Sequence, residues 1–328
     1  MIVMIIRRLI QSVIVMLTVG LIAFIMFRYV GDPIAQMVGQ DTPIDVRERM
    51  REELGLNDAV IVQFLRFVGN TARGQFGISF RIGRPVNELI LERLPATLEL
   101  SLLAAAFALV VGIPMGIYTG LHPQHWLSKV FLTVSLVGIS LPTFFIGILL
   151  ILLFGVVLGW LPTFGRGDVV DLGGWSTGLL TASGLKSLIM PAFTLGLFQL
   201  TLTMRLVRSE ILEVLRTDFI KFARARGLTN RAVNFGHALK NTLVPVITIT
   251  GLQLGGIIAF AIITETVFQW PGMGLLFVQA VEFADIPVMS TYLVLIALFF
   301  VVINLVVDML YFVVDPRLRV ERTAVGGH

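Results

Sequence analysis

The chain has 328 residues, of which 56% are apolar and only 14% charged, whereas a soluble globular domain carries about 25% charged residues. This deficit excludes an ordinary soluble domain and indicates lipid as the solvent, so the net charge of +4 is better explained by loop topology than by nucleic-acid binding. Because the chain has no cysteine, disulfides, thiolate metal sites and cysteine nucleophiles are excluded.

Long runs without a charged residue recur along the chain and predict its membrane spans. A helix needs roughly 20 apolar residues to cross a bilayer, and apolar runs of this length form helices rather than barrel strands. The runs cover residues 9–27, 100–118, 130–165, 187–204, 241–264 and 286–307. We therefore predict an all-α polytopic membrane protein with six transmembrane helices. The first lies within 1–30, and the others lie at about 97–119, 130–158, 187–207, 242–264 and 286–313.

The first run begins after Arg7 and Arg8, as a signal peptide would. Its apolar part exceeds the usual ~7–15 residues of such a leader, so we interpret it as a retained first helix. By the positive-inside rule the two arginines place the N-terminus in the cytoplasm. Six spans return the C-terminus to the same side, where residues 315–322 hold three arginines. Residues 323–328 form a short tail.

The segment 31–96 is then a long external loop after the first helix. It holds eight arginines and nine acids, and loops of this length count weakly toward orientation. An amphipathic helix is expected at 45–56, ended by Gly55, and a second helix from Ala59 to about Ala72. Residues 74–80 are expected to be extended. The loop is interpreted as a cap over the bundle, and it also could receive a partner that delivers substrate.

Prolines and glycines mark special positions in the spans. Pro142 and Pro191 are expected to kink the third and fourth helices, either for rocking or for static packing. Gly251, Gly255 and Gly256 are expected to let helices approach closely.

A basic loop, residues 208–241, separates the fourth and fifth spans. Residues 205–240 hold eight Lys/Arg and three acids, a balance of +5, whereas residues 265–288 hold three acids and no Lys or Arg. This contrast places the basic loop in the cytoplasm. A short amphipathic helix is expected over 218–226, with Phe219, Phe222, Ala223 and Ala225 on an apolar side and Gly227 as its stop. A second helix from about Asn230 leads to the fifth span. Such a helix could also lie on anionic lipid headgroups.

No catalytic constellation emerges from the sequence. His122 and His125 are separated by Pro123, which breaks helical spacing, so no metal site is predicted. The chain lacks the GxxxxGKS/T phosphate loop. Any ATP that drives this protein must therefore be bound by another subunit, and no catalytic residue or cofactor is assigned to this chain.

Several motifs occur in an order that resembles one family. When its positions are aligned on Gly227, the basic loop does not match the general Glu-Ala-Ala pattern that importer permeases share. It is similar to the form found in the peptide branch, through Asp218, Phe219, residues 223–228 and residues 237–241. Further matches are LPATLEL at 94–100, LPTFGRG at 161–167, ETVFQWPGMG at 265–274, and the blocks NLVVDMLY and DPRLR within 304–319. The chain thus resembles permeases of bacterial ATP-binding-cassette importers, of the dipeptide/oligopeptide branch, and in particular the first of the two permeases.

This resemblance implies a type I importer permease fold in the bacterial inner membrane. It implies a second, homologous permease, two ATPase subunits that hold ATP and Mg²⁺, and a periplasmic or lipid-anchored substrate-binding protein. ATPase coupling is implied for one set of residues: Asp218, Phe219, Phe222, Ala223, Arg224, Ala225, Arg226, Gly227 and Leu228. His237 is interpreted as a residue that orients the second helix.

Four further residues are candidates for the pathway or its gate. Glu265 opens the block 265–274 after the fifth span, and Trp270 lies within it. We interpret this block as a loop that orders the mouth of the pathway, with peptide contact as an alternative. Asn304 and Asp308 lie one turn apart on one face of the sixth span. An intramembrane acid suggests function, but we interpret Asp308 as a residue that makes structural hydrogen bonds or pairs with a basic residue near the cytoplasmic face.

Three alternatives remain open at this stage. The same architecture could carry glutathione, nickel complexes or oligosaccharides. A proton-coupled carrier would use acids such as Asp308 as a relay. A membrane scaffold or receptor would have no polar pathway.

Overall fold

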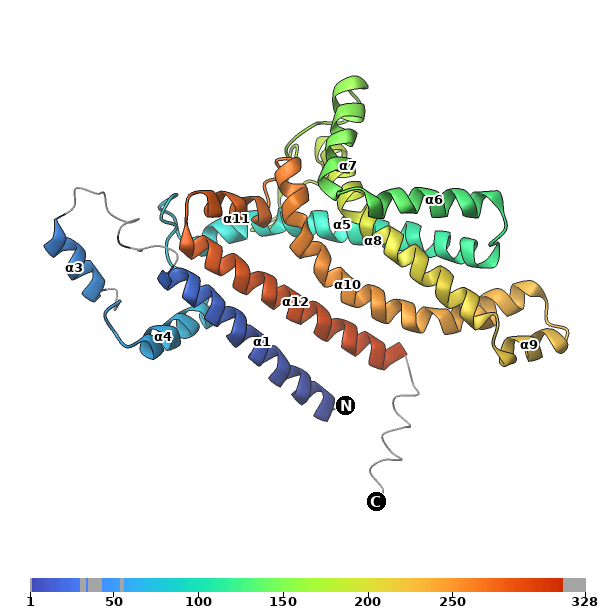
Figure 1. The fold of residues 1–328 in the computed structure, drawn as a ribbon. Helices are drawn as coiled ribbons and strands as arrows, with labels where there is room; N and C mark the ends of the chain where they lie inside the picture. Colours follow the sequence, from blue (N-terminus) through green and yellow to red (C-terminus); the bar gives the residue numbers. More distant parts are fainter. Residues whose placement is uncertain (1, 30–33, 35–42, 54–55, 315–328) are drawn as a thin grey trace, which may run out of the picture.

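A computed structural model describes residues 2–29, 34, 43–53 and 56–314 of the chain. The predictions for Gly55 and for the basic tail at 315–328 lie outside the described residues. Figure 1 shows a bundle of long helices, with α9 at one end and α11 at the other. We call these the basic-loop end and the opposite end.

The long helices are α1 (Ile2–Tyr29), α5 (Val86–Leu121), α8 (Ala182–Val214), α10 (Leu239–Val267) and α12 (Ile286–Val314). The shorter ones are α3 (Ile44–Glu53), α4 (Val60–Ala72), α6 (Trp126–Ser140), α7 (Thr143–Leu150), α9 (Asp218–Ala225) and α11 (Met273–Glu282), with the π-helical segments η1 (Ile151–Val157) and η2 (Ala232–Ala238). Strands β1 (Val170–Asp171) and β2 (Ser176–Thr177) pair antiparallel, with Val170 opposite Thr177. The predicted helices within 31–96 correspond to α3 and α4, whereas α11 and the β-hairpin were not predicted.

Among the described residues, α1, α5, α8 and α12 are each long and apolar enough to cross a membrane, and the number rises to six if each of two bent pairs is one span. The 232–267 pair bends by 50° between Gly251 and Gly255. The 126–157 pair bends by 108° at the break that holds Pro142, so the kink predicted there is a sharp break between two helices. Leu141 before Pro142 is extended, with φ −96° and ψ 138°, because a proline disfavours helical geometry in the preceding residue.

Helices α5 and α8 form the centre of the bundle, and glycines let their backbones approach. A Cβ built on Gly116 would lie 2.6 Å from Cβ of Val207 and 2.7 Å from the carbonyl oxygen of Met204. Similar close contacts occur at Gly112, Gly120 and Gly196. Close packing replaces the hydrophobic effect as the main source of helix association in lipid.

Helices α10 and α12 also meet through glycines. A Cβ on Gly251 would lie 2.7 Å from Val307, and one on Gly255 would lie 3.0 Å from the Phe300 ring. The predicted close approach is confirmed at these two positions. At Gly256 an added Cβ would meet only Phe260 of the same helix, so that glycine makes no such contact.

Helix α1 lies beside α12 (Figure 1). Nε of Arg8 lies 2.8 Å from one carboxylate oxygen of Asp308, and its Nη2 donates to the other oxygen at 2.9 Å. This bidentate pair joins the two helices near the basic-loop end.

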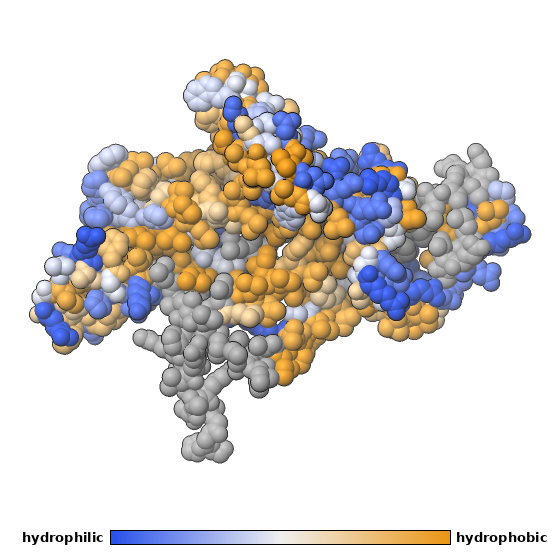
Figure 2. All heavy atoms as spheres, turned by 180° about the vertical axis from the view of Figure 1, so that it is seen from behind, coloured by the Kyte–Doolittle hydropathy of each residue, from blue (hydrophilic) through white to orange (hydrophobic). Residues whose placement is uncertain are grey.

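The surface suits a lipid environment. Figure 2 shows apolar side chains over much of the middle of the molecule, with hydrophilic ones gathered toward its ends. Helices α7 and η1 project from the bundle (Figure 1). Their exposed apolar side chains include Phe144, Phe145, Leu152 and Val156. An apolar surface of this extent marks a lipid or protein contact rather than one with water.

We predict that Gly116→Ala destabilises the bundle, because the new methyl group would overlap Val207 and the backbone at Met204. Overpacking of this kind costs about 1–3 kcal/mol. Gly69→Ala in α4 is the control, since a Cβ there meets nothing within 4 Å. The measurement is the temperature at which half of the protein has aggregated, read by size-exclusion chromatography after heating. It should fall for the Gly116 variant and not for the Gly69 variant, and equal midpoints for the two variants would contradict the packing argument.

Candidate functional site

The basic loop begins as a continuation of α8, which extends to Val214. After a turn, α9 starts at Asp218, preceded by Thr217 in an extended conformation. Asp218 lies in the first helical turn, where a negative charge interacts favourably with the helix dipole. Its Oδ1 also lies 2.8 Å from Nζ of Lys221. Both side chains are exposed, so this pair adds little stability.

One face of α9 is fixed to the rest of the loop. Ile220 is fully buried and Ala223 nearly so. Both pack with Val233 and Ala238 of η2, and partly buried side chains from the end of α8 complete this cluster. The prediction that Ala223 shares an exposed apolar side with the phenylalanines was therefore wrong, because the helical spacing of Ile220 and Ala223 places them together on the inward face. Ile220 was missed as its partner.

The opposite face of α9 is exposed and carries aromatic and cationic groups. Phe219 is 43% exposed, Phe222 64% and Leu228 42%. Arg224, Ala225, Arg226 and Gly227 are also exposed. The guanidinium carbon of Arg226 lies 5.7 Å from the centre of the Phe222 ring, a distance consistent with a cation–π contact.

Gly227 ends the helix, as predicted. Its φ is +82°, a conformation that a side chain disfavours. The N–H of Gly227 donates to the carbonyl of Arg224, and that of Leu228 to the carbonyl of Ala223. These two bonds form a Schellman motif. An added Cβ on Gly227 would meet nothing within 4 Å, so the constraint at this position is the backbone conformation.

The loop returns to the membrane through η2 and α10. His237 is exposed there, and its carbonyl oxygen accepts a hydrogen bond from Nδ2 of Asn241. Further along, Nε2 of Gln199 in α8 donates to Oε1 of Gln253 in α10. The helices on either side of the basic loop are thus joined both at the loop and within the bundle.

Glu265 lies at the opposite end of the molecule and is fully buried. Its Oε1 accepts a hydrogen bond from Oγ1 of Thr97 at 2.6 Å, and its Oε2 accepts one from the backbone N–H of Leu275 at 2.9 Å. The carboxylate also lies against Gly272, where an added Cβ would overlap it. Glu265 therefore joins α10, α5 and the start of α11.

Trp270 is also fully buried. Its Nε1 donates to the carbonyl of Ala96 at 3.0 Å, and its ring belongs to the core cluster that includes Leu100, Leu188 and Ala261. Protein encloses Trp270 and Glu265 in this structure, so neither side chain presents a surface to a solute. Their contacts order the end of the bundle.

Asp308 pairs with Arg8, which confirms the expected pairing with a basic residue. Asn304 donates instead to the carbonyl of Phe300 in its own helix. The two residues share a face of α12 but have separate partners.

A buried ion pair was missed at the sequence level. Nη2 of Arg166 donates to Oε2 of Glu99 at 2.6 Å, and the two side chains are only 7% and 3% exposed. Arg166 also donates to the carbonyl and hydroxyl oxygens of Ser176. The pair thereby ties the loop containing β2 to α5. A signal was present, since Glu99 and Arg166 are the charged residues of LPATLEL and LPTFGRG.

Asp285 was likewise counted only as a charge. It is buried beside the N-terminus of α12 and accepts hydrogen bonds from Oγ of Ser79 and from the backbone N–H groups of Phe80 and Arg81. These bonds fasten residues 79–81 to the end of the bundle. The predicted extended segment at 74–80 has one isolated bridge, between Ile78 and Pro85.

His122 and His125 lie near Tyr118 at the end of α5. The Tyr118 hydroxyl lies 2.9 Å from Nδ1 of His125, and the N–H of Leu127 donates to the same nitrogen. Within the described residues no group of three or more His, Asp and Glu side chains is arranged to hold a metal ion.

We predict that Glu99→Gln and Arg166→Met each destabilise the protein strongly, because removing one partner of a buried ion pair costs about 3–5 kcal/mol. The double variant should recover part of this loss. Arg84→Gln is the control, since its pairs with Glu88 and Glu92 are half exposed and such pairs contribute about 0–1 kcal/mol. The measurement is the thermal midpoint of the purified protein. If the double variant loses as much stability as the two single variants added together, the two side chains are not coupled.

Comparison with known proteins shows which family this chain matches. Residues 112–320 match the family described as binding-protein-dependent transport system inner membrane component, and residues 1–101 match its N-terminal counterpart. The oligopeptide transport system permease protein of Bacillus subtilis (strain 168) is 38% identical over 96% of this chain and 98% of its own. The di/tripeptide transport system permease protein of Pseudomonas aeruginosa (strain UCBPP-PA14) is 39% identical over 93% and 95%.

A solved structure of the inward-facing MetNI methionine ABC transporter shares the fold, with a TM-score of 0.54 at 18% identity over 69% of this chain and 96% of that one. The apolar helices and these matches agree on a multi-pass membrane protein. The chain belongs to the family of inner membrane components of binding-protein-dependent transport systems.

Proposed function

We propose that this chain is a permease subunit of an ATP-driven importer for dipeptides or oligopeptides. The peptide cargo is supported by the relatives from Bacillus and Pseudomonas, which match over nearly the full length of this chain. The observation that carries the mechanism is the short helix α9, which is fixed to the bundle on one face and presents Phe219 and Phe222 on the other.

The exposed face of α9 suits an ATPase subunit as its partner. Aromatic and arginine side chains dominate the binding energy of many protein interfaces. Phe219 and Phe222 would enter an apolar groove, with Arg224 and Arg226 at its rim. The other members of the expected coupling set serve this face in different ways. Asp218 favours the helix start, Ala223 anchors the helix, Ala225 allows close approach, and Gly227 with Leu228 forms its end.

Movement of α9 would be passed to two spans at once. Ile220 and Ala223 contact side chains at the end of α8 and in η2, which leads directly into α10. The Gln199–Gln253 hydrogen bond joins the same two helices within the bundle. When the ATPase subunits, with ATP and Mg²⁺ bound, displace α9, the helices α8 and α10 would therefore move together. This chain would need no cofactor of its own.

The remaining partners are a second, homologous permease, a second ATPase subunit and a substrate-binding protein. The projecting α7–η1 arm, with its exposed apolar side chains, suits contact with the second permease in the membrane. The charge contrast between the basic loop and residues 265–288 supports a cytoplasmic basic loop and cytoplasmic termini, in a bacterial inner membrane.

The contacts of the acidic residues argue against a proton-coupled carrier. Asp308 pairs with Arg8, and Glu265 accepts two hydrogen bonds from Thr97 and Leu275. Proton relays use chains of ionisable groups along a pathway, whereas these two acids lie toward different ends of the bundle, each with its own structural partners.

We predict that Leu228→Cys reacts with a membrane-impermeant maleimide only after the cell membrane is permeabilised, whereas Leu172→Cys, in the turn between β1 and β2, reacts in intact spheroplasts. Both positions are exposed, and the native chain has no cysteine to interfere. Labelling of Leu228→Cys from outside would reverse the orientation and exclude ATPase docking on α9.

We predict that Phe222→Asp and Ala225→Glu leave the protein in the membrane but reduce ATPase co-purification and uptake of labelled di- and tripeptides by about tenfold or more, the loss typical of an interface hot spot. Ala72→Glu is the matched control, because Ala72 is an exposed residue near the end of α4, remote from the basic loop. Ala223→Glu should instead reduce the folded yield, since Ala223 is buried. Normal co-purification and uptake with both surface variants would refute the docking role.

A further inference from the structure

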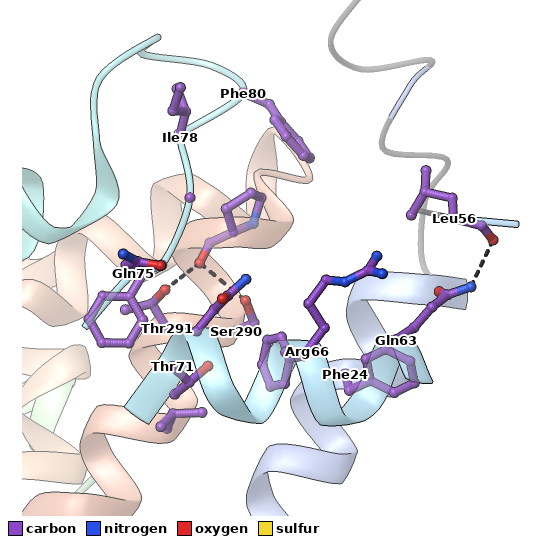
Figure 3. Close-up of a pocket in the computed structure, with 16 residues that line it drawn as sticks. Phe24, Leu56, Gln63, Arg66, Thr71, Gln75, Ile78, Phe80, Ser290 and Thr291 are labelled. Atoms are coloured by element: carbon purple, nitrogen blue, oxygen red, sulfur yellow. Dashed lines mark hydrogen bonds between the residues drawn. The ribbon is translucent and has the colours of Figure 1, made fainter. Parts of the chain in front are cut away.

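A cavity of about 360 Å³ lies at the opposite end of the molecule, away from the basic loop. It is enclosed by parts of α1 and α4, by residues 75–80, and by the first turns of α12 (Figure 3). Its volume is at the lower end of the range for small-molecule sites, about 300–1,000 Å³. The proposed importer mechanism leaves this cavity without a role.

The wall of the cavity is mainly apolar. Phe24, Phe67 and Phe76 supply aromatic surface, and Val294 lines it from α12. Phe24 also packs against Phe67, with ring centroids 6.0 Å apart. This lining suits a hydrocarbon ligand, which gains free energy from every methylene that it removes from water.

Three polar side chains in the wall, those of Gln63, Ser290 and Thr291, have partners within the protein. Nε2 of Gln63 donates to the carbonyl of Leu56 at 2.7 Å and to that of Asp58 at 2.8 Å. The hydroxyl groups of Ser290 and Thr291 both donate to the carbonyl of Pro287, as the dashed lines in Figure 3 show. These three side chains therefore offer no free donor to a ligand, and the polar groups of Asn70, Thr71 and Gln75 lie in a wall whose exposed area is mainly apolar.

The position of the cavity indicates where its ligand comes from. Phe24 lies near the end of the apolar span Ile6–Met26, and the span of α12 begins at Ile286. The cavity is therefore at the level where the hydrocarbon of the bilayer gives way to headgroups. A chain from the adjoining leaflet can reach it without leaving the membrane.

Helix α4 shows the character of a helix in the membrane interface. Ile61 and Leu65, one turn apart on one face, are 64% and 63% exposed. An amphipathic helix with an exposed apolar face lies with that face among acyl chains and its charged groups at the headgroups. Contact between Phe24 and Phe64, with centroids 5.5 Å apart, holds α4 at the end of α1.

Arg66 of α4 stands at the edge of the cavity (Figure 3). Its Nη2 lies 2.7 Å from Oδ2 of Asp58, and both side chains are nearly half exposed. This pair leaves further guanidinium N–H groups for a phosphate oxygen. Because the Asp58 carboxylate would repel an anion, the headgroup contributes less to the binding free energy of the lipid than the acyl chain does.

We infer that this cavity binds an acyl chain of a phospholipid from the adjoining leaflet, with Arg66 placed to contact the headgroup phosphate. The bound lipid would fill the space between α4 and α12 and seal the edge of the bundle there.

The test uses the full-length chain in nanodiscs of phosphatidylethanolamine and phosphatidylglycerol, with a trace of phosphatidylglycerol that carries a diazirine on one acyl chain. After illumination, mass spectrometry should locate lipid adducts on peptides from α4 and from the start of α12. Gln75→Trp and Thr71→Trp, which place a ring into the cavity, should each reduce these adducts by about tenfold, since displacing two methylenes has roughly that effect. Gln75 is exposed, so at least this variant should fold normally.

Arg66→Gln should lower the adducts by a smaller factor, whereas Arg73→Gln, which removes an exposed arginine just beyond the end of α4, should leave them unchanged. Adducts spread over the exposed faces of the spans, or adducts at the cavity that persist in both tryptophan variants, would overturn the inference. A second experiment places a photoreactive residue at position 75 in cells. If it captures a protein there, and the nanodisc preparation shows no lipid adduct, the inference is also overturned.

Discussion

Close contact between α5 and α8 is the constraint on which the rest of this structure depends. Gly116 and Gly120 on one helix and Gly196 on the other leave no room for an added methyl group, and Gly112 leaves little. In lipid, apolar side chains gain little by leaving the solvent, so such contacts must supply the association energy. Once α5 and α8 are joined along their length, the other spans and the connecting loops have a fixed surface to pack against.

Buried polar contacts then fix the end of the bundle opposite the basic loop. Glu99 with Arg166, Glu265 with Thr97, and Asp285 with residues 79–81 each join segments far apart in the sequence. Polar groups without water must find partners inside the protein, so each contact specifies one arrangement of its loop. At the basic-loop end, Arg224 and Arg226 of α9 are exposed, and the buried Ile220 and Ala223 anchor this helix through apolar contacts. One end thus holds buried polar contacts, and the other carries the exposed face that we propose as the ATPase contact.

Much of the architecture was accessible from the sequence because hydropathy and charge are local properties. The long uncharged runs predicted apolar spans, of which the described residues hold four, or up to six if each bent pair is one span, and the charge contrast identified the basic loop. Gly227 was recognised as a helix stop because glycine tolerates the positive φ with which many helices end. The resemblance to importer permeases rested on ordered motifs, and it agrees with the family shown by the full-length comparison. The sequence did not reveal that Ala223 faces inward, because the apolar character of a residue does not state which surface covers it.

By itself, then, the sequence determined a multi-span helical protein of the importer permease family with an amphipathic helix in its basic loop. Only the tertiary structure decided that Leu141 and Pro142 break the third hydrophobic run into two helices bent by 108°. It alone paired Glu99 with Arg166 and Arg8 with Asp308, and it formed the cavity between α4 and α12. The physical reason is that spans are set by transfer of neighbouring residues into lipid, whereas bends, ion pairs and cavities depend on which distant surfaces meet.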